Sequence, residues 1–434
     1  MNIAIDGHNL GAKYGTGLAA SAKSLAYNLS EMGHNVYPIY ALSGIHNNKM
    51  LMSSSFFQNL ATKGELDSIK SLGFALNTAK YIIGNFFPLF SRLKHIASCY
   101  PLELASMQNM LPEEVAGYLN APVLYNSSYA ISVLFGTETR INKPKSINLD
   151  ILHLTMPLPI HIRGIKKIVT VHDIIPLKVP KSCDINLKYY YKTLMVSLKK
   201  ADLIFATSTN TKNDLIEVLK IPEKKIHITY QAARIPDYIN HLPDEQLTPL
   251  LNYYQLKKNK YFIFYGAIEP KKNLFNLVQA FRISKTDFPL IIIGKNGWLY
   301  EDVLQLLDEN NSSNLRSKIR RIPYLPFTHI LYLLKGARCL IFPSIYEGFG
   351  LPVLESMTIG TPVITSNSSS ITEIAGNAAY LIDPNSIESI RKSIEFMSAN
   401  DKIVSSMSER GLLQSDKFSL KNYQKRLSEG YMIL

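Results

Sequence analysis

The segment CLIFPSIYEGFGLPVLE, from Cys339 to Glu355, decides the fold. Its apolar run CLIF is typical of a buried strand, and the two glycines that follow allow a tight turn with uncovered backbone amides. The proline suits the first turn of a helix. Two acids, Glu347 and Glu355, flank this turn. The segment therefore predicts a strand, a turn and a helix, with either two solvated acids or a pocket for a polar ligand.

The same alternation of short apolar strands and helices extends through most of the chain and favours a parallel α/β architecture. Since 434 residues exceed what one hydrophobic core usually serves, we expect two domains. We place them at residues 1–245, with an irregular region at 45–150, and at 246–409, followed by a helical segment at 410–434 that we expect to cross back to the N-terminal domain. In the first half, the clearest strands are predicted at 2–5, 35–42, 166–171 and 202–208, and the clearest helices at 17–33 and 187–201. In the second half, the alternation continues at 261–267, 273–283, 289–294, 319–325, 329–337, 339–344, 351–360, 362–367 and 378–383.

The composition indicates a folded protein of a reducing compartment. Hydrophobic residues make up 46% and charged residues 19% of the chain, and the three cysteines suggest neither a disulfide framework nor a zinc site. The N-terminus has no signal-peptide pattern, and the apolar stretch 74–90 is interrupted by Lys80 and Pro88, so we predict no membrane span. The net charge of +13 fits nucleic acid, an anionic membrane surface or small anionic substrates. We expect no nucleic acid, because no arginine-rich block or aromatic RNA-binding signature occurs.

Polar residues also follow the strand predicted at 261–267. There the sequence YGAIEPKKN places Gly266 in a turn and Lys271, Lys272 and Asn273 just before a helix. Cations next to free helix N–H groups make an anion site suited to phosphate. The alternative is a solvated lysine pair at a helix start.

Two further segments end strands of the first half. IVTVHDIIP places His172 where it could carry a proton or bind a substrate, or simply be satisfied by backbone groups. In GAKYGTGLAA, Gly15, Gly17 and Ala20 match the dinucleotide pattern G-x-G-x-x-A. The glycines come several residues after the strand, and the second strand lacks the acid that would hold a ribose. We therefore expect a glycine loop that faces the cleft between the domains.

The sequence has no D-x-D carboxylate pair, P-loop, nucleophile elbow or H-E-x-x-H motif. A nucleoside diphosphate would then be neutralised by lysines and helix ends, and we expect neither a metal nor a cofactor.

With these motifs, the sequence resembles the retaining glycosyltransferases of family 4, which have the GT-B fold, and in particular bacterial mannosyltransferases of surface-polysaccharide synthesis. The most specific match is the pair of glutamates in the frame G-F-G-L-P. The other matching segments are GTGL, VHDIIPLKVP, ADLIFATSTNTKNDL, GAIEPKKNL, IIIGKNGW and AAYLIDP. The resemblance implies two Rossmann-like domains with parallel sheets facing a cleft, the first binding the acceptor and the second the donor nucleotide.

The resemblance also implies roles for single residues. His172, Glu347 and Lys272 would form the catalytic set, contacting the donor sugar, its hydroxyls and the diphosphate in that order. Other donor contacts are implied for Gly15, Gly17, Gly266, Lys271, Asn273, Tyr324, Phe349, Gly350, Leu351 and Glu355, with Glu355 on the ribose and Tyr324 near the base. Many relatives carry an arginine where this chain has Ala267, so that contact is missing or is supplied by Lys271.

The implied reaction is metal-independent transfer of a hexose, with GDP-mannose the preferred donor, to a lipid-linked glycan of the O-antigen, capsule or exopolysaccharide type. UDP- or dTDP-linked sugars, or a non-catalytic partner of another transferase, are the alternatives. We expect a cytoplasmic protein that can associate with the inner face of an anionic membrane. Region 45–150 could bind that membrane, the acceptor or another subunit.

Overall fold

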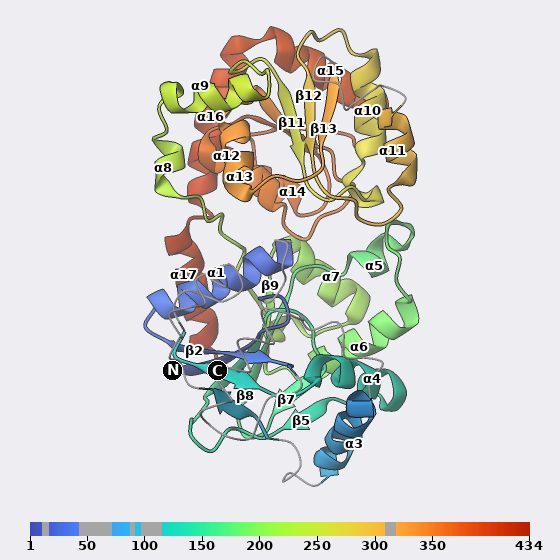
Figure 1. Cartoon of the computed structure of the whole chain (residues 1–434), viewed down its shortest axis with the longest axis vertical. Helices are drawn as coiled ribbons and strands as arrows, with labels where there is room; N and C mark the ends of the chain where they lie inside the picture. Colours follow the sequence, from blue (N-terminus) through green and yellow to red (C-terminus); the bar gives the residue numbers. More distant parts are fainter. Residues whose placement is uncertain (11–16, 43–71, 87–91, 97–114, 309–317) are drawn as a thin grey trace.

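The computed structural model describes residues 1–10, 17–42, 72–86, 92–96, 115–308 and 318–434. Within them the chain builds two α/β units, stacked along the long axis of the molecule (Figure 1). We call them the N-terminal unit and the C-terminal unit. Both are centred on a sheet of parallel strands, so the predicted two-domain α/β fold is confirmed.

The sheet of the N-terminal unit has the strand order β10-β9-β8-β6-β1-β2-β4-β3, and β5 pairs with β7 in a small second sheet. Its pairings are parallel except for β3 with β4, an antiparallel edge that the sequence did not predict. The strands are β1 Asn2–Asp6, β2 Asn35–Tyr40, β3 Lys94–Ile96, β4 Tyr118–Asn120, β5 Thr139–Ile141, β6 Ile151–Leu154, β7 Ile160–Ile162, β8 Lys166–Val171, β9 Leu203–Ala206 and β10 Ile226–Ile228.

Capping residues fix where some helices of this unit begin. Asn186 and Ser208 cap two of them by accepting hydrogen bonds from Tyr189 N and Thr211 N. The helices are α1 Gly17–Glu31, α3 Leu72–Phe86, α4 Leu124–Phe135, α5 Ile175–Lys178, η4 Pro180–Ser182, α6 Leu187–Lys199, α7 Thr209–Leu219 and η5 Glu223–Lys225.

The sheet of the C-terminal unit is parallel throughout, in the order β13-β12-β11-β14-β15-β16. Its strands are β11 Phe262–Tyr265, β12 Leu290–Ile293, β13 Ile319–Ile322, β14 Cys339–Phe342, β15 Val363–Ser366 and β16 Tyr380–Ile382. The helices from Asp237 onward are α8 Asp237–Asn240, α9 Asp244–Tyr253, η6 Pro270–Lys272, α10 Leu274–Ile283, α11 Glu301–Asp308, α12 Phe327–Gly336, α13 Leu351–Ile359, α14 Ile371–Ala375, α15 Ile387–Ala399, α16 Asp401–Asp416 and α17 Leu420–Met432.

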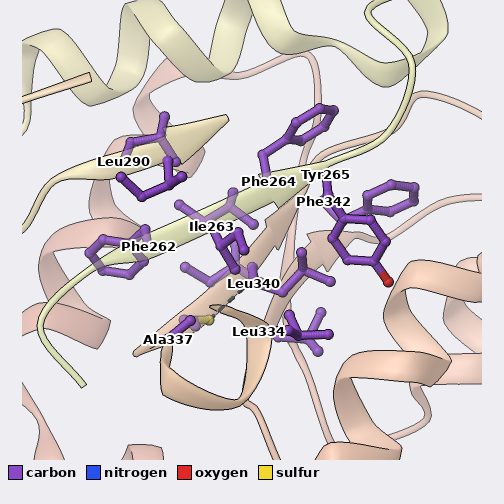
Figure 2. Close-up of a cluster of buried hydrophobic side chains, with 14 of the residues drawn as sticks. Phe262, Ile263, Phe264, Tyr265, Leu290, Leu334, Ala337, Leu340 and Phe342 are labelled. Carbon is purple, nitrogen blue, oxygen red and sulfur yellow. Dashed lines mark hydrogen bonds between the residues drawn. The ribbon is translucent and has the colours of Figure 1, made fainter. Parts of the chain in front are cut away.

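The apolar strands of the C-terminal unit form its core. β11 and β14 are buried along their length, and their side chains pack against those of the neighbouring strand β12 and helix α12 (Figure 2). Phe264 stacks on Phe342 with the ring centroids 6.3 Å apart. This packing fixes the positions of β11 and β14. The loops that follow these two strands therefore start from fixed positions.

The last helix, α17, leaves the C-terminal unit and packs on the first sheet. Its Tyr423, Leu427 and Tyr431 are buried in the same cluster as Ile3 and Ile5 of β1. Figure 1 shows α17 beside α1, at the end of the molecule that also holds the N-terminus. The predicted domain limits after residues 245 and 409 fall inside α9 and α16, and the division of the chain at these two positions stays a prediction.

Candidate functional site

The loop between β14 and α13 presents a helix N-terminus. Gly350 adopts the left-handed region, with φ of 103°, and precedes the helix, whose first turn contains Pro352. In the described part of the chain, the amides of Phe349, Gly350 and Leu351 have no hydrogen-bond acceptor. Glu347 stands just before them and is held by Ser369, which accepts from its amide at 3.0 Å. The loop therefore offers N–H donors and a carboxylate side by side.

The loop after β11 brings two lysines to the same place. The Lys272 Nζ lies 2.6 Å from Glu347 Oε1 and 5.0 Å from the centroid of the Phe342 ring. The Lys271 Nζ lies 3.3 Å from Glu269 Oε1. The Lys271 carbonyl accepts from the Ile345 amide at 2.8 Å, which ties this loop to the one after β14.

The charges of this cluster stabilise one another. Burial alone would raise the pKa of Glu347, but Lys272 and Lys271 outweigh it and hold that pKa below the ordinary value. Burial alone would lower the pKa of Lys271, but Glu347, Glu269 and Asp173 raise it. Glu347 and Lys271 are thus both ionised at neutral pH. The site therefore combines positive charge, which could bind an anion, with a carboxylate, which could accept hydrogen bonds from hydroxyls.

Glu355 lies further along α13 in a different environment. It is buried and accepts a hydrogen bond from the Tyr265 hydroxyl at the end of β11. Burial raises the pKa of Glu355 to about 7, although the Tyr265 hydrogen bond lowers it. The two glutamates of the motif therefore differ in pKa, because the lysines outweigh the burial of Glu347, whereas the Tyr265 hydrogen bond only partly offsets the burial of Glu355.

His172 reaches the cleft from the end of β8 in the N-terminal unit. Its Nε2–H donates to the Thr155 carbonyl at 2.9 Å, and its Nδ1 accepts from the Gln231 side-chain amide at 2.8 Å. Burial lowers the pKa of His172, although the Thr155 hydrogen bond raises it. Both ring nitrogens are thus occupied in a neutral imidazole, so it must exchange one of these partners to bind a sugar hydroxyl.

The two loops meet across the cleft at Gly348. A Cβ atom on this residue would lie 2.0 Å from the His172 carbonyl oxygen, so no side chain fits. The hydroxyls of Thr207 and Thr211 donate to the His172 carbonyl at 2.8 and 3.0 Å, and both also approach the Gly348 carbonyl. The motifs EGFG and HD are therefore in direct contact.

A second set of contacts joins the units beside the loops. The Glu373 carboxylate of α14 accepts from the amides of Thr209 and Asn210, at the start of α7, both at 3.0 Å. The Tyr346 hydroxyl donates to Asp214 of the same helix. A carboxylate at a helix N-terminus is electrostatically favourable, so these contacts stabilise the closed arrangement.

A cavity of about 270 Å³ adjoins the cluster. Both units line it, with Lys271 and Trp298 on one side and Asp173, Asp184 and Ile185 on the other. The Trp298 indole N–H donates to the Ser182 carbonyl at 2.6 Å, which closes one edge. In the described ranges, no group of three histidine, cysteine or acidic side chains could hold a metal ion.

The remaining predicted residues take different places. Gly266 follows β11 with φ of 147°, and Gly17 opens α1, where a Cβ atom would meet nothing within 4 Å. The Asn273 side-chain amide donates to the carbonyls of Pro343 and Pro384 at 3.2 and 2.6 Å. These hydrogen bonds hold the loop in place. Tyr324 is exposed between β13 and α12. Gly15 lies outside the described residues, and the roles of all these residues stay predictions.

Several site residues carry no motif. Gln231 and Thr155, which fix the imidazole, come from the ends of β10 and β6, and Glu269 lies between Gly266 and the lysines. Glu269 and Tyr265 could have been found, because both stand in the quoted segment YGAIEPKKN and Tyr265 ends the strand β11. Gln231 had no sequence signal, since only the order of the strands brings it near His172.

Comparison with known families matches both units. The family described as "Glycosyltransferase Family 4" matches residues 116–233, and "Glycosyl transferases group 1" matches residues 253–413. The chain is 35% identical over 277 residues to "O-antigen chain mannosyltransferase B" of Escherichia coli, covering 62% of this chain and 71% of that protein. It is 26% identical over 273 residues to "Serotype-specific mannosyltransferase WbdA" of Escherichia coli, covering 61% of this chain and 33% of that longer protein.

Solved structures with the same fold are more distant in sequence. A glycosyltransferase of Rickettsia africae superposes with a TM-score of 0.62 at 17% identity, covering 99% of this chain and 97% of that one. The sucrose-phosphate synthase of Thermosynechococcus elongatus gives 0.65 at 15% identity, covering 100% and 98%. Anabaena HepE in complex with UDP and glucose gives 0.61 at 12% identity, covering 100% of both chains. The chain therefore belongs to the family 4 glycosyltransferases, enzymes with the GT-B fold.

Proposed function

We propose that this enzyme transfers a mannosyl residue from GDP-mannose to a hydroxyl of a growing surface glycan, with retention of configuration and without a metal ion. The sugar and the pathway are supported by the names of two relatives. They are O-antigen chain mannosyltransferase B and, at 27% identity over 244 residues, the "O-antigen chain mannosyltransferase RfbU" of Salmonella typhimurium. One observation carries the chemistry: the Lys272–Glu347 pair at the N-terminus of α13, beside the contact of Gly348 with His172.

In the proposed reaction the bond between the sugar C1 and the diphosphate breaks as negative charge builds on the leaving group. Lys272, Lys271 and the amides before α13 face that charge and stabilise it electrostatically. Glu347 accepts hydrogen bonds from sugar hydroxyls and stabilises the positive charge on the ring. The acceptor hydroxyl forms the new bond on the face that the diphosphate leaves, and its proton passes to a phosphate oxygen. No protein nucleophile is required in this scheme.

Lysine charge takes the place that a divalent cation would otherwise fill. The Lys272 ammonium needs only to leave Glu347 and turn to the phosphate, because the two sit within one cluster. The negative charge of Glu347 would then be stabilised by the sugar hydroxyls and by Lys271. Such an exchange would let the reaction proceed without a metal ion.

Two alternatives remain open. The donor could be a UDP- or dTDP-linked sugar, and a Campylobacter jejuni relative, 26% identical over 227 residues, is named as an N-acetylgalactosaminyltransferase. The chain could also bind a sugar nucleotide without turnover, as the partner of another transferase. The contact of Lys272 with Glu347, beside the contact of Gly348 with His172, favours catalysis, because binding alone does not require this arrangement.

We also propose a lipid-linked acceptor at the inner face of the cytoplasmic membrane. The name of the Campylobacter jejuni relative includes a diphospho-undecaprenol acceptor. Among the described helices, none is long and apolar enough to cross a membrane. We propose that the contact with the membrane is peripheral.

A donor screen tests the proposal. The purified protein is incubated in EDTA with GDP-mannose and with other GDP-, UDP- and dTDP-linked sugars, with and without lipid-linked glycan, and release of the nucleoside diphosphate is measured. We expect release from GDP-mannose, undiminished by EDTA, and an α-linked product by NMR, since the donor bond is also α. Release that requires added Mg²⁺ would contradict the metal-free scheme. No release from any donor would favour the non-catalytic partner.

A further inference from the structure

Three neighbouring helices of the N-terminal unit expose apolar side chains to solvent. On α3, Leu76, Ile83 and Phe86 are exposed, with Phe86 79% accessible. Leu76 and Ile83 are seven residues apart and therefore share one face of the helix. On α4, Leu134 and Phe135 are exposed, with Leu134 70% accessible. Isolated exposed apolar residues are ordinary, but several on adjacent helices indicate a contact surface.

Helix α6 continues the same surface. Its Leu187 and Tyr191 are exposed and stand four residues apart on one face. The Lys192 Nζ donates to the Val133 carbonyl of α4 at 2.5 Å, which fixes α6 against α4. Helix α3 packs on α4 in turn, and the three helices follow one another along one side of the N-terminal unit (Figure 1). We call the exposed side chains of these helices the α3–α4–α6 surface.

The charge of this surface has one sign. The three helices contain Lys80, Lys188, Lys192 and Lys199 and no aspartate or glutamate. Lys80, Lys188 and Lys199 are exposed. Leucine, isoleucine and aromatic side chains next to lysines are the composition of segments that lie in the interface of an anionic bilayer.

The surface also borders the site. Ile185, which precedes α6 and is exposed, lines the cavity that Lys271 shares with Asp173. A membrane that touches α6 would thus lie next to the opening between the units. An acceptor anchored in that membrane could present its glycan to the cleft without leaving the bilayer.

We propose that the α3–α4–α6 surface docks on an anionic lipid membrane, with its apolar side chains in the interface and its lysines on the headgroups. The proposal rests on the lipid-linked acceptor of the proposed function and names the part of the chain that meets the bilayer. The apolar side chains provide the affinity for the interface, and the lysines provide the preference for anionic lipid.

Vesicle flotation tests the docking. The full-length protein is mixed with vesicles of phosphatidylcholine alone or with phosphatidylglycerol added, at low and at high salt. We expect flotation with the anionic vesicles, weakened by salt because the lysine–headgroup attraction is screened. Lys80→Glu with Lys188→Glu should lower binding at least about tenfold, since each lysine near an anionic surface strengthens binding several-fold. Phe86→Ser with Leu134→Ser should lower binding to a similar extent.

A matched control comes from the other unit. Lys402 and Leu413 of α16 are also exposed, so Lys402→Glu with Leu413→Ser makes the same kinds of change elsewhere. This variant should float like the wild type. Wild-type protein that does not float, or a control variant that loses as much binding as the surface variants, would overturn the proposal. The proposal would also be overturned if the wild-type protein self-associates and the surface variants are monomeric, because the surface would then pair two copies of the chain.

Donor turnover without vesicles separates this proposal from the proposed function. The surface variants should release nucleoside diphosphate at the wild-type rate, because none of the changed residues touches the Lys272–Glu347 cluster. A protein that floats through this surface but turns over no donor would leave the docking standing and overturn the function. A protein that turns over the donor but never floats would leave the function standing and overturn the docking.

Discussion

Single residues of the site are set by their partners rather than by their own chemistry. Glu347 and Glu355 belong to one sequence motif, yet lysines hold the pKa of Glu347 down while burial raises that of Glu355 to about 7. A raised carboxyl pKa means that the ligand-free protein favours the protonated acid near neutral pH. Glu355 therefore titrates in the physiological range.

This titration predicts how nucleotide binding depends on pH. If ribose hydroxyls donate to Glu355, the bound state favours the carboxylate, and the affinity should rise with pH. At pH values below the pKa of about 7, the affinity for GDP should fall about tenfold for each pH unit. GDP should therefore bind roughly tenfold more weakly at about pH 6 than at about pH 8. Isothermal titration calorimetry of the wild type and of Glu355→Gln measures this slope.

The Glu355→Gln variant is the control, because it removes the titrating group and leaves the proton equilibria of GDP itself. We expect the GDP affinity of this variant to lack the roughly tenfold change between about pH 6 and about pH 8 that comes from Glu355. Equal slopes in both proteins would contradict the ribose assignment.

The same pKa makes a stability prediction of known sign. The folded pKa of about 7 lies above the ordinary value of 4.5, so stability is complete below about pH 4.5 and is lost as pH rises through about 7. The shift corresponds to about 3 kcal/mol. The free energy of unfolding of Glu355→Gln, relative to wild type, should therefore rise by up to that amount between about pH 5 and pH 8. Denaturant unfolding at several pH values checks this, and a constant difference would contradict it.

The sequence predicted the charged residues of the site but not what holds them. Lys272 and Glu347 stood out because each follows an apolar strand within a turn-forming segment, and the structure brings them into contact. Gln231, Thr155 and Ser369 were not predicted. These polar residues act through the order of strands and the path of loops, which a single sequence does not reveal.

At the scale of elements, two strand-to-helix loops form the site by touching. The loop after β14 lies against the end of β8 so closely that the backbone of Gly348 contacts that of His172. Neither loop could be placed on the other from sequence, since they belong to different sheets. The elements themselves were predicted well, because buried parallel strands form continuous apolar runs.

A side chain at Gly348 should push the two units apart. In Gly348→Ala the new Cβ atom would lie 2.0 Å from the His172 carbonyl, far inside van der Waals contact, so the loops must separate. We expect donor turnover to fall by at least about tenfold, because displacement of the reacting groups is costly. Small-angle scattering should show a larger radius of gyration.

Gly17→Ala serves as the comparison, because open space surrounds that Cβ position. It should leave the scattering profile unchanged, whatever it does to donor binding. A compact, fully active Gly348→Ala enzyme would show that the closed contact is not needed.

At the scale of the whole molecule, the chain returns to its beginning. Helix α17 comes last in the sequence and packs on the first sheet, where the Tyr431 hydroxyl and His153 form a buried hydrogen bond. Gly430 lies so close to Phe205 of β9 that an added Cβ atom would be 2.5 Å from its ring. The stability of the N-terminal unit therefore depends on residues more than two hundred positions away.

Gly430→Ala tests this dependence. Overpacking against Phe205 should cost about 1–3 kcal/mol, and the better helix propensity of alanine should return up to about 1 kcal/mol. We expect amide hydrogens of β8 and β9 to exchange faster, while those of β11 and β12 stay unchanged. Glu429→Ala, at an exposed neighbouring position, should have almost no effect. Faster exchange confined to the C-terminal unit would contradict this account.

The overall plan was predicted more fully than the region from 45 to 150. The alternation of strands and helices indicated two parallel sheets, which the structure confirms. In that region the described residues form α3, α4 and strands of three residues each, including the antiparallel edge strand β3. Such short strands are too short for a clear periodic pattern of apolar residues, so little in the sequence indicated them.

The central claim is that Lys272 and Glu347 act together on a sugar nucleotide, and donor turnover in four proteins tests it most directly. The proteins are the wild type, Lys272→Ala, Glu347→Ala and the double variant, compared at equal folded fraction by thermal unfolding. We expect each single variant to lose roughly 10²–10³ in kcat, and the double variant to lose little more, because the residues work as a unit. Folded variants that turn over the donor at the wild-type rate would contradict the account.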